Sequence, residues 1–214
     1  TLPIFPLTGA LLLPGGRLPL NIFEPRYLNM VLDALAGDRM IGMIQPRDAS
    51  AAAAPLSAPG RPSPPVFEIG CSGRIISFSE SADGRFLITL KGVARFRAGD
   101  EIATTRGYRR MAIDFADFAG DLTPSPIEGM DRPRLLQALR VYFDAKGMSA
   151  DWSAIDDSPD EGLVTTLAMV CPFAPSEKQV LLECEDGRKR SEIMIAIMEM
   201  AAHESQDGSD APTH

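Results

Sequence analysis

The chain has 214 residues, a net charge of −8, and hydrophobic and charged contents of 45% and 23%. These values are typical of a globular protein with one large domain or two small ones. The acidic charge argues against nucleic-acid binding, which needs clustered positive charge. No run of about 18 apolar residues occurs, and no basic segment precedes the first apolar residues. We therefore expect neither a membrane partner nor a signal peptide.

The three cysteines, Cys71, Cys171 and Cys184, lie far apart in the sequence. Their odd number and wide spacing match neither a disulfide framework nor a paired-cysteine metal site. We therefore expect buried, reduced thiols and a cytoplasmic location.

The charge and the apolar pattern both change near residue 118. Residues 1–118 carry a slight excess of basic residues, whereas the remainder carries the acidic excess. Apolar residues alternate along much of the first part and recur every three to four positions in the second. These changes predict a β-rich domain over residues 1–118, an α-helical subdomain over 119–203 and a disordered tail over 204–214.

The first part opens with short apolar runs. Residues 2–7 and 10–14 are predicted strands interrupted by prolines, which is typical of edge positions and strand ends. A helix is predicted from Pro25 to Gly37, because proline fits the first helical turn and apolar residues follow at helical spacing. Residues 39–46 form the next predicted strand.

A loop and a hairpin follow. Residues 49–65 are rich in Ala, Pro, Ser and Gly without an apolar period, which indicates a mobile loop. Strands are predicted over residues 66–79 and 85–97, with Asp83-Gly84 in the turn between them. In the first of these strands, Gly70 and Gly73 indicate a bulge or a close approach of another backbone.

The β-rich part ends with a predicted turn at Ala98-Gly99-Asp100 and a last strand over residues 106–118. Short strands of this kind with one early helix predict a partly closed β-barrel. The second part is predicted to be a helical bundle that begins near Ser125-Pro126. Within it, Ser158-Pro159-Asp160-Glu161 is typical of a capping box, in which the serine and the glutamate bond the first backbone N–H groups of a helix.

Several short motifs resemble the Lon N-terminal domain family, which includes stand-alone bacterial proteins of the peptidase S16 lon-domain type. The first set is Ile4-Phe5-Pro6-Leu7, Leu13-Pro14-Gly15 and Leu20-Asn21-Ile22-Phe23-Glu24-Pro25-Arg26-Tyr27. A second set lies in the predicted hairpin, as Gly73-Arg74-Ile75, Asp83-Gly84-Arg85 and a Leu-x-Gly-Val-x-Arg-Phe segment from Leu90 to Phe96. A third is Pro172-Phe173-Ala174-Pro175-Ser176-Glu177-Lys178-Gln179.

The resemblance implies an α+β fold, with an N-terminal PUA-like, partly closed barrel followed by a helical bundle. It also implies a non-catalytic module that recognises unfolded or exposed polypeptide segments, acting in protein quality control with a protease or chaperone. We expect a monomer or a weak dimer. Apolar contact and strand addition at an open sheet edge would supply the binding.

Two groups of residues are candidates for peptide binding. One is the corner between the early strands and the first helix, with Phe23, Glu24, Arg26 and Tyr27. The other is a possible basic strip on the strands, with Arg74, Arg95 and Arg97. The alternative for the corner is structural, with aromatic residues in the core and an arginine that bonds a carbonyl or an acid. The alternative for the strip is a solvated strand face.

No catalytic residues, metal site or cofactor are expected. The sequence holds neither a Gly-x-x-x-x-Gly-Lys-Ser/Thr phosphate loop nor a Gly-x-Ser-x-Gly elbow. The two histidines, His203 and His214, lie near the end of the chain, so a Ser-His or Cys-His nucleophile pair would have to recruit a fraying terminus. Carboxylate pairs such as Asp156-Asp157 fit helix starts or solvated faces better than metal sites. An alternative function remains, a small-ligand protein or enzyme with a pocket between barrel and helices.

Overall fold

The computed structural model describes residues 1–48, 64–123 and 126–207. Contacts between Cα atoms divide the chain into two compact units. The β-rich unit comprises Thr1–Pro124 and Pro172–Leu182, and the helical unit comprises Ser125–Cys171 and Glu183–His214.

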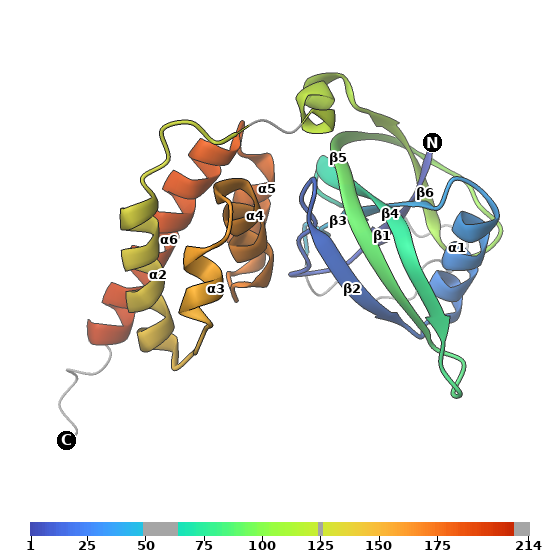
Figure 1. Cartoon of the computed structure of the whole chain (residues 1–214). Coiled ribbons are helices and arrows are strands. Elements are labelled where there is room, and N and C mark those ends of the chain that lie inside the picture. The colour runs from blue at the N-terminus through green and yellow to red at the C-terminus, as the bar shows by residue number, and fades with distance from the viewer. Residues whose placement is uncertain (49–63, 124–125, 208–214) are drawn as a thin grey trace. The chain divides into compact units, whose positions relative to one another are not determined.

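The β-rich unit contains one six-stranded mixed sheet with the order β2-β5-β4-β3-β1-β6. The long strand β5 also pairs with β6, so the sheet curls back on itself and partly closes, while β2 stays at its edge (Figure 1). This architecture confirms the predicted α+β fold, as a partly closed sheet rather than a regular barrel. The strands are β1 (Leu2–Pro6), β2 (Arg17–Ile22), β3 (Met40–Ile44), β4 (Ile69–Glu80), β5 (Phe86–Ile102) and β6 (Arg109–Asp114).

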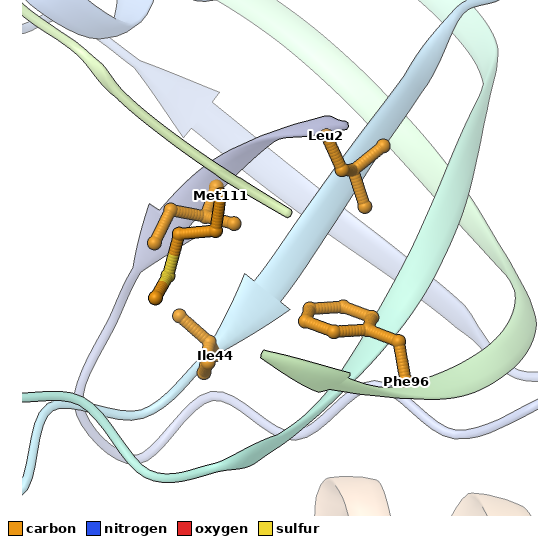
Figure 2. Packing of buried hydrophobic residues seen from close by; sticks show 5 residues of the cluster. Leu2, Ile44, Phe96 and Met111 are labelled. Carbon is orange, nitrogen blue, oxygen red and sulfur yellow. The ribbon is translucent and has the colours of Figure 1, made fainter. Parts of the chain in front are cut away.

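Alternating apolar residues build the core inside this sheet. Leu2, Ile44, Phe96 and Met111 come from four different strands and point toward one another (Figure 2). A Cβ atom on Gly70 of β4 would lie 2.6 Å from the backbone oxygen of Met43 in β3 and 2.6 Å from the ring of Phe96. The predicted close approach at Gly70 is therefore confirmed, and a register shift between Ser72 and Gly73 confirms the bulge.

A loop with three buried leucines packs across β5, and the predicted strand over residues 10–14 is wrong. Leu11, Leu12 and Leu13 are buried without joining the sheet. The loop is fastened by two backbone hydrogen bonds: Gly15 N–H donates to Gly92 O at 3.0 Å, and Gly92 N–H donates to Gly16 O at 2.9 Å. The apolar run favoured a strand in the sequence, but its leucines fill the core from a loop.

The hairpin between β4 and β5 is confirmed, with Gly84 at a φ of 79° in its turn. The predicted turn at Ala98-Gly99-Asp100 is wrong, because β5 runs through these residues with an irregular register between Ala98 and Glu101. An irregularity of this kind bends a strand without ending it. The last strand is also shorter than predicted, and the helix η2 (Ala116–Leu122) follows it.

The helical unit contains four helices in the part of the chain that the structure describes. Apolar residues that recur at helical spacing face its core, since Leu135, Leu139 and Tyr142 are buried. The predicted capping box is wrong: Ser158 Oγ donates to Ala154 O at 2.6 Å, and Glu161 Oε1 accepts from Ile127 N at 3.3 Å. The helices are α2 (Arg132–Lys146), α3 (Trp152–Asp156), α4 (Asp160–Val170) and α6 (Gly187–Asp207).

Helix α5 (Pro175–Glu183) lies almost entirely in the β-rich unit, although it falls within the helical subdomain predicted over residues 119–203. Side chains fasten it there. Gln45 Nε2 donates to Pro175 O at 2.9 Å and to Gln179 Oε1 at 3.2 Å, and Lys178 Nζ donates to Gly9 O at 3.0 Å. The third family-like motif therefore attaches a helix to the sheet.

Two predicted mobile segments fall largely outside the described residues. Of the loop 49–65, residues 49–63 are not described, and of the tail 204–214, residues 208–214 are not described. Helix α6 continues into the tail as far as Asp207. The domain boundaries at residues 118 and 203 stay predictions.

Candidate functional site

The corner between β2 and helix α1 (Pro25–Ala36) brings three of the predicted site residues together. Glu24 is the N-cap residue with an extended backbone, and Pro25 occupies the first helical turn, where its missing N–H costs nothing. Tyr27, Met30 and Val31 are buried and hold the helix on the sheet. The local sequence thus determines where the strand region ends and the helix begins.

Arg26 links the two sides of this corner. Its Nε donates to Glu24 Oε2 at 2.8 Å, and its Cζ lies 4.6 Å from the centre of the Tyr27 ring. The Tyr27 ring in turn packs at 4.2 Å from the ring of Phe5. Burial raises the pKa of the Tyr27 hydroxyl, and the positive charge of Arg26 opposes this rise. The arrangement supports a structural role for Arg26 and Tyr27.

Replacing Arg26 by alanine is expected to lower the free energy of unfolding by about 1 kcal/mol, because the ion pair and the ring contact are lost while Glu24 stays hydrated. Replacing it by lysine should recover part of the loss, since an ammonium keeps the charge but lacks the planar fork. Urea unfolding of the parent and both variants measures these differences. An alanine variant as stable as the parent, but weaker in peptide binding, would instead make Arg26 a ligand contact.

Phe23 differs from its neighbours because its side chain is largely exposed, at 62%. The guanidinium carbon of Arg85 lies 5.8 Å from the centre of its ring. Leu87 of β5 is also exposed and lies directly opposite Asn21 of β2. Asn21 precedes Phe23 by two residues, so Leu87 lies near the end of β2 that leads to Phe23. Phe23 and Leu87 therefore place exposed apolar surface at one end of the β2 edge.

Strand β2 pairs only with β5, so its other side is an open edge in the described part of the sheet. In an antiparallel pair, successive residues turn their backbone N–H and C=O groups alternately toward the partner strand and away from it. Gly92 N–H of β5 donates to Gly16 O, which fixes this alternation along β2. By that alternation, the backbone groups of Arg17, Pro19 and Asn21 face the open side. Pro19 has no N–H, which removes the middle donor and limits uncontrolled strand pairing.

The three strand arginines do not form one surface. Arg95 is buried and makes a forked ion pair with Asp121 of η2, with Nε–Oδ2 and NH2–Oδ1 distances of 2.9 and 2.7 Å. Arg97 is exposed and pairs with Asp117, also in η2. Arg74 is exposed on β4, directly opposite Lys91 of β5.

Asp121 was missed by the sequence analysis, although it completes the environment of Arg95. Its Oδ2 also accepts from the backbone N of Arg95 at 2.9 Å, and Arg95 NH1 donates to Leu182 O at 3.3 Å. The guanidinium carbon lies 4.8 Å from the centre of the Phe118 ring. No local sequence signal links Asp121 to a strand arginine, because the pair forms only when η2 folds against β5.

Other kinds of site receive little support from the geometry. Across residues 1–48, 64–123 and 126–207, no three His, Cys, Asp or Glu side chains are grouped so that they could hold a metal ion. Cys71, Cys171 and Cys184 are buried thiols. Within the same ranges, no helix combines the length and the apolar character that crossing a membrane requires.

Comparison with known proteins gives a consistent result. Residues 1–200 match the family described as the ATP-dependent protease La (LON) substrate-binding domain. Lon protease 2 of Myxococcus xanthus is 22% identical over 200 residues, covering 92% of this chain and 23% of that protein. Lon protease 2 of Thermus thermophilus is 27% identical over 202 residues, covering 93% and 24%. The chain thus spans about a quarter of these relatives.

Solved structures show the same fold. A Lon N-terminal domain protein from Xanthomonas campestris aligns with a TM-score of 0.60 and 22% identity, over 91% of this chain and 96% of that one. The N-terminal domain of the Mycobacterium avium complex Lon protease aligns with a TM-score of 0.57 and 15% identity, over 92% and 97%.

Proposed function

Because the chain belongs to the Lon substrate-binding domain family, we propose that its β-rich unit binds unfolded or exposed polypeptide segments along strand β2. The observation that carries this proposal is the open edge of β2 beside the exposed side chains of Phe23 and Leu87. An extended peptide can add to such an edge through backbone hydrogen bonds, while its side chains enter neighbouring contacts.

The open edge of β2 offers few backbone groups, so we expect peptides to bind it weakly and reversibly. Arg17 and Asn21 each offer a backbone N–H and a C=O on the open side, whereas Pro19 offers only its C=O. Phe23 adds an apolar contact at one end, and its ring is already held beside Arg85. Main-chain bonding of this kind tolerates many sequences, which suits a module that must recognise diverse clients.

Binding of this kind needs no catalytic residue, so the unit acts without ATPase or peptidase chemistry of its own. A role in protein quality control follows, in which the module presents clients to a protease or a chaperone. We also propose that the protein is cytoplasmic and acts as a monomer or a weak dimer.

Replacing Phe23 by alanine is expected to weaken peptide binding about tenfold, which corresponds to about 1.4 kcal/mol, because an exposed aromatic anchor is lost. The free energy of unfolding should hardly change, since the ring is mostly solvated. Fluorescence anisotropy with a fluorescein-labelled, unstructured ten-residue apolar peptide measures the binding. The matched control is Leu122→Ala, because Leu122 is 64% exposed but lies on η2.

Strand addition is tested separately with the same peptide after N-methylation of alternate backbone amides. Methylation in the register that faces β2 should abolish binding, and methylation in the other register should not. If Phe23→Ala left the affinity unchanged, or both methylated peptides bound like the parent peptide, the β2 edge would not be the binding site.

A further inference from the structure

Three cations lie side by side across the outer face of the sheet, next to the open edge. Arg17 of β2 is directly opposite Lys91 of β5, and Lys91 is directly opposite Arg74 of β4. All three side chains are exposed, and their neighbours Gly16, Leu90 and Ile75 are buried on the other face. We name Arg17, Lys91 and Arg74 the basic row.

No carboxylate in the described part of the chain pairs with the basic row. Among the residues that the structure describes, none of its three side chains takes part in an ion pair or a hydrogen bond. Like charges placed directly opposite each other on adjacent strands destabilise a sheet. Other exposed arginines of the same unit, such as Arg47, Arg85 and Arg97, do have carboxylate partners.

The rows beside it also lack carboxylates. Pro19, Thr89 and Ser77 form the next row, and Asn21, Leu87 and Ser79 form the row after that. The outer face of β2, β5 and β4 is therefore basic at one end and carries the exposed Leu87 at the other, near Phe23, which follows the end of β2. This local charge stands out in a chain whose net charge is −8.

We propose that the basic row binds the carboxylates of acidic residues in the polypeptide that adds to β2, so that acidic-apolar segments are the preferred clients. The inference rests on the proposed function, because it assigns a sequence preference to the same edge. The basic row and the Asn21–Leu87 row are four residues apart along β2, or about 13 Å in an extended strand. A client that carries acidic and apolar side chains four positions apart meets both ends.

The test compares two labelled ten-residue peptides on the full chain. One carries two glutamates near one end and leucine and phenylalanine near the other, and its counterpart carries glutamines in place of the glutamates. Each is made in both sequence directions, because strand addition can be parallel or antiparallel. We expect the glutamate peptide to bind about tenfold more tightly at low salt in at least one direction, and the preference to shrink as salt screens the charges.

Charge removal then assigns the preference to the basic row. The triple variant Arg17→Gln, Lys91→Gln and Arg74→Gln should bind both peptides equally, with a melting temperature equal to or above that of the parent because repulsion within the row is relieved. The control variant Arg134→Gln, Arg188→Gln and Lys189→Gln changes the net charge equally on exposed residues of the helical unit. It should keep the parent's preference.

The outcomes separate the two proposals. Equal binding of the glutamate and glutamine peptides by the parent, or a preference that survives in the triple variant, overturns the basic row as a selector and leaves strand addition standing. If neither peptide binds, the proposed function is overturned, and this inference with it. Tight binding of inorganic polyphosphate through the basic row, without a preference between the peptides, would show that the row serves a non-peptide polyanion and would also overturn the inference.

Discussion

Replacing Asp121 by alanine is expected to lower the free energy of unfolding of the β-rich unit by about 3–5 kcal/mol, because it breaks a buried ion pair and removes the carboxylate that accepts two hydrogen bonds from the Arg95 guanidinium. The two side chains are only 8% and 11% exposed, so water cannot replace the lost partner. Asp121 also accepts from the backbone N of Arg95, and this bond is lost as well.

The matched control is Asp117→Ala in the same helix, η2. Asp117 pairs with Arg97, but both side chains are about half exposed, at 60% and 48%. Removing an exposed pair of this kind should cost less than about 1 kcal/mol. The comparison separates the burial of the Arg95 pair from any effect of changing η2 itself.

Chemical unfolding of the full chain gives both values. Far-UV circular dichroism follows the secondary structure of both units, while the fluorescence of Trp152, the only tryptophan, follows the helical unit. Two probes are needed because chains with two units need not unfold in one step. Equal stability of the Asp121→Ala and Asp117→Ala proteins would contradict the assigned role of the Arg95–Asp121 pair.

Replacing Gly92 by alanine is expected to destabilise the β-rich unit by about 3 kcal/mol, because the added methyl group overlaps a backbone atom that cannot turn away. A Cβ atom at this position would lie 1.9 Å from Leu13 O and 2.7 Å from Leu13 C. The Leu11–Leu13 loop would have to move, and its buried leucines and its bonds to Gly92 would be disturbed.

Gly99→Ala on the same strand is the control for the intrinsic effect of the substitution. The nearest atom to a Cβ there is Ala112 O at 3.5 Å, which is an ordinary contact. This variant should stay within about 0.5 kcal/mol of the parent or be slightly more stable, since alanine restricts the unfolded chain. Urea midpoints of the two variants provide the measurement, and a Gly92→Ala protein as stable as Gly99→Ala would disprove the close packing at Leu13.

The local features of this protein follow from its sequence. The helix after Pro25 was predicted correctly because a proline start and a 3.6-residue apolar period act over a single segment. The β4–β5 hairpin was predicted for the same reason, since Asp83-Gly84 supplies the turn and apolar residues alternate on either side. The family motifs at both ends of the chain indicated the partly closed α+β fold.

Burial without strand pairing could not be predicted from the local pattern. Residues 10–14 are apolar enough for a strand, but Leu11, Leu12 and Leu13 fill the core from a loop that crosses Gly92. Whether an apolar run joins a sheet depends on which other segment occupies the neighbouring edge. That competition is resolved only when the whole sheet forms.

The candidate site depends on contacts between segments far apart in the chain. Arg17, Lys91 and Arg74 become one row through the registers of β2–β5 and β5–β4, and Arg95 meets Asp121 only when η2 folds against β5. The sequence alone named the corner residues Phe23, Glu24, Arg26 and Tyr27, because they are neighbours along the chain. Tertiary structure decided which cations are neutralised inside the fold and which remain beside the open edge, because strand register and helix docking are set by the core as a whole.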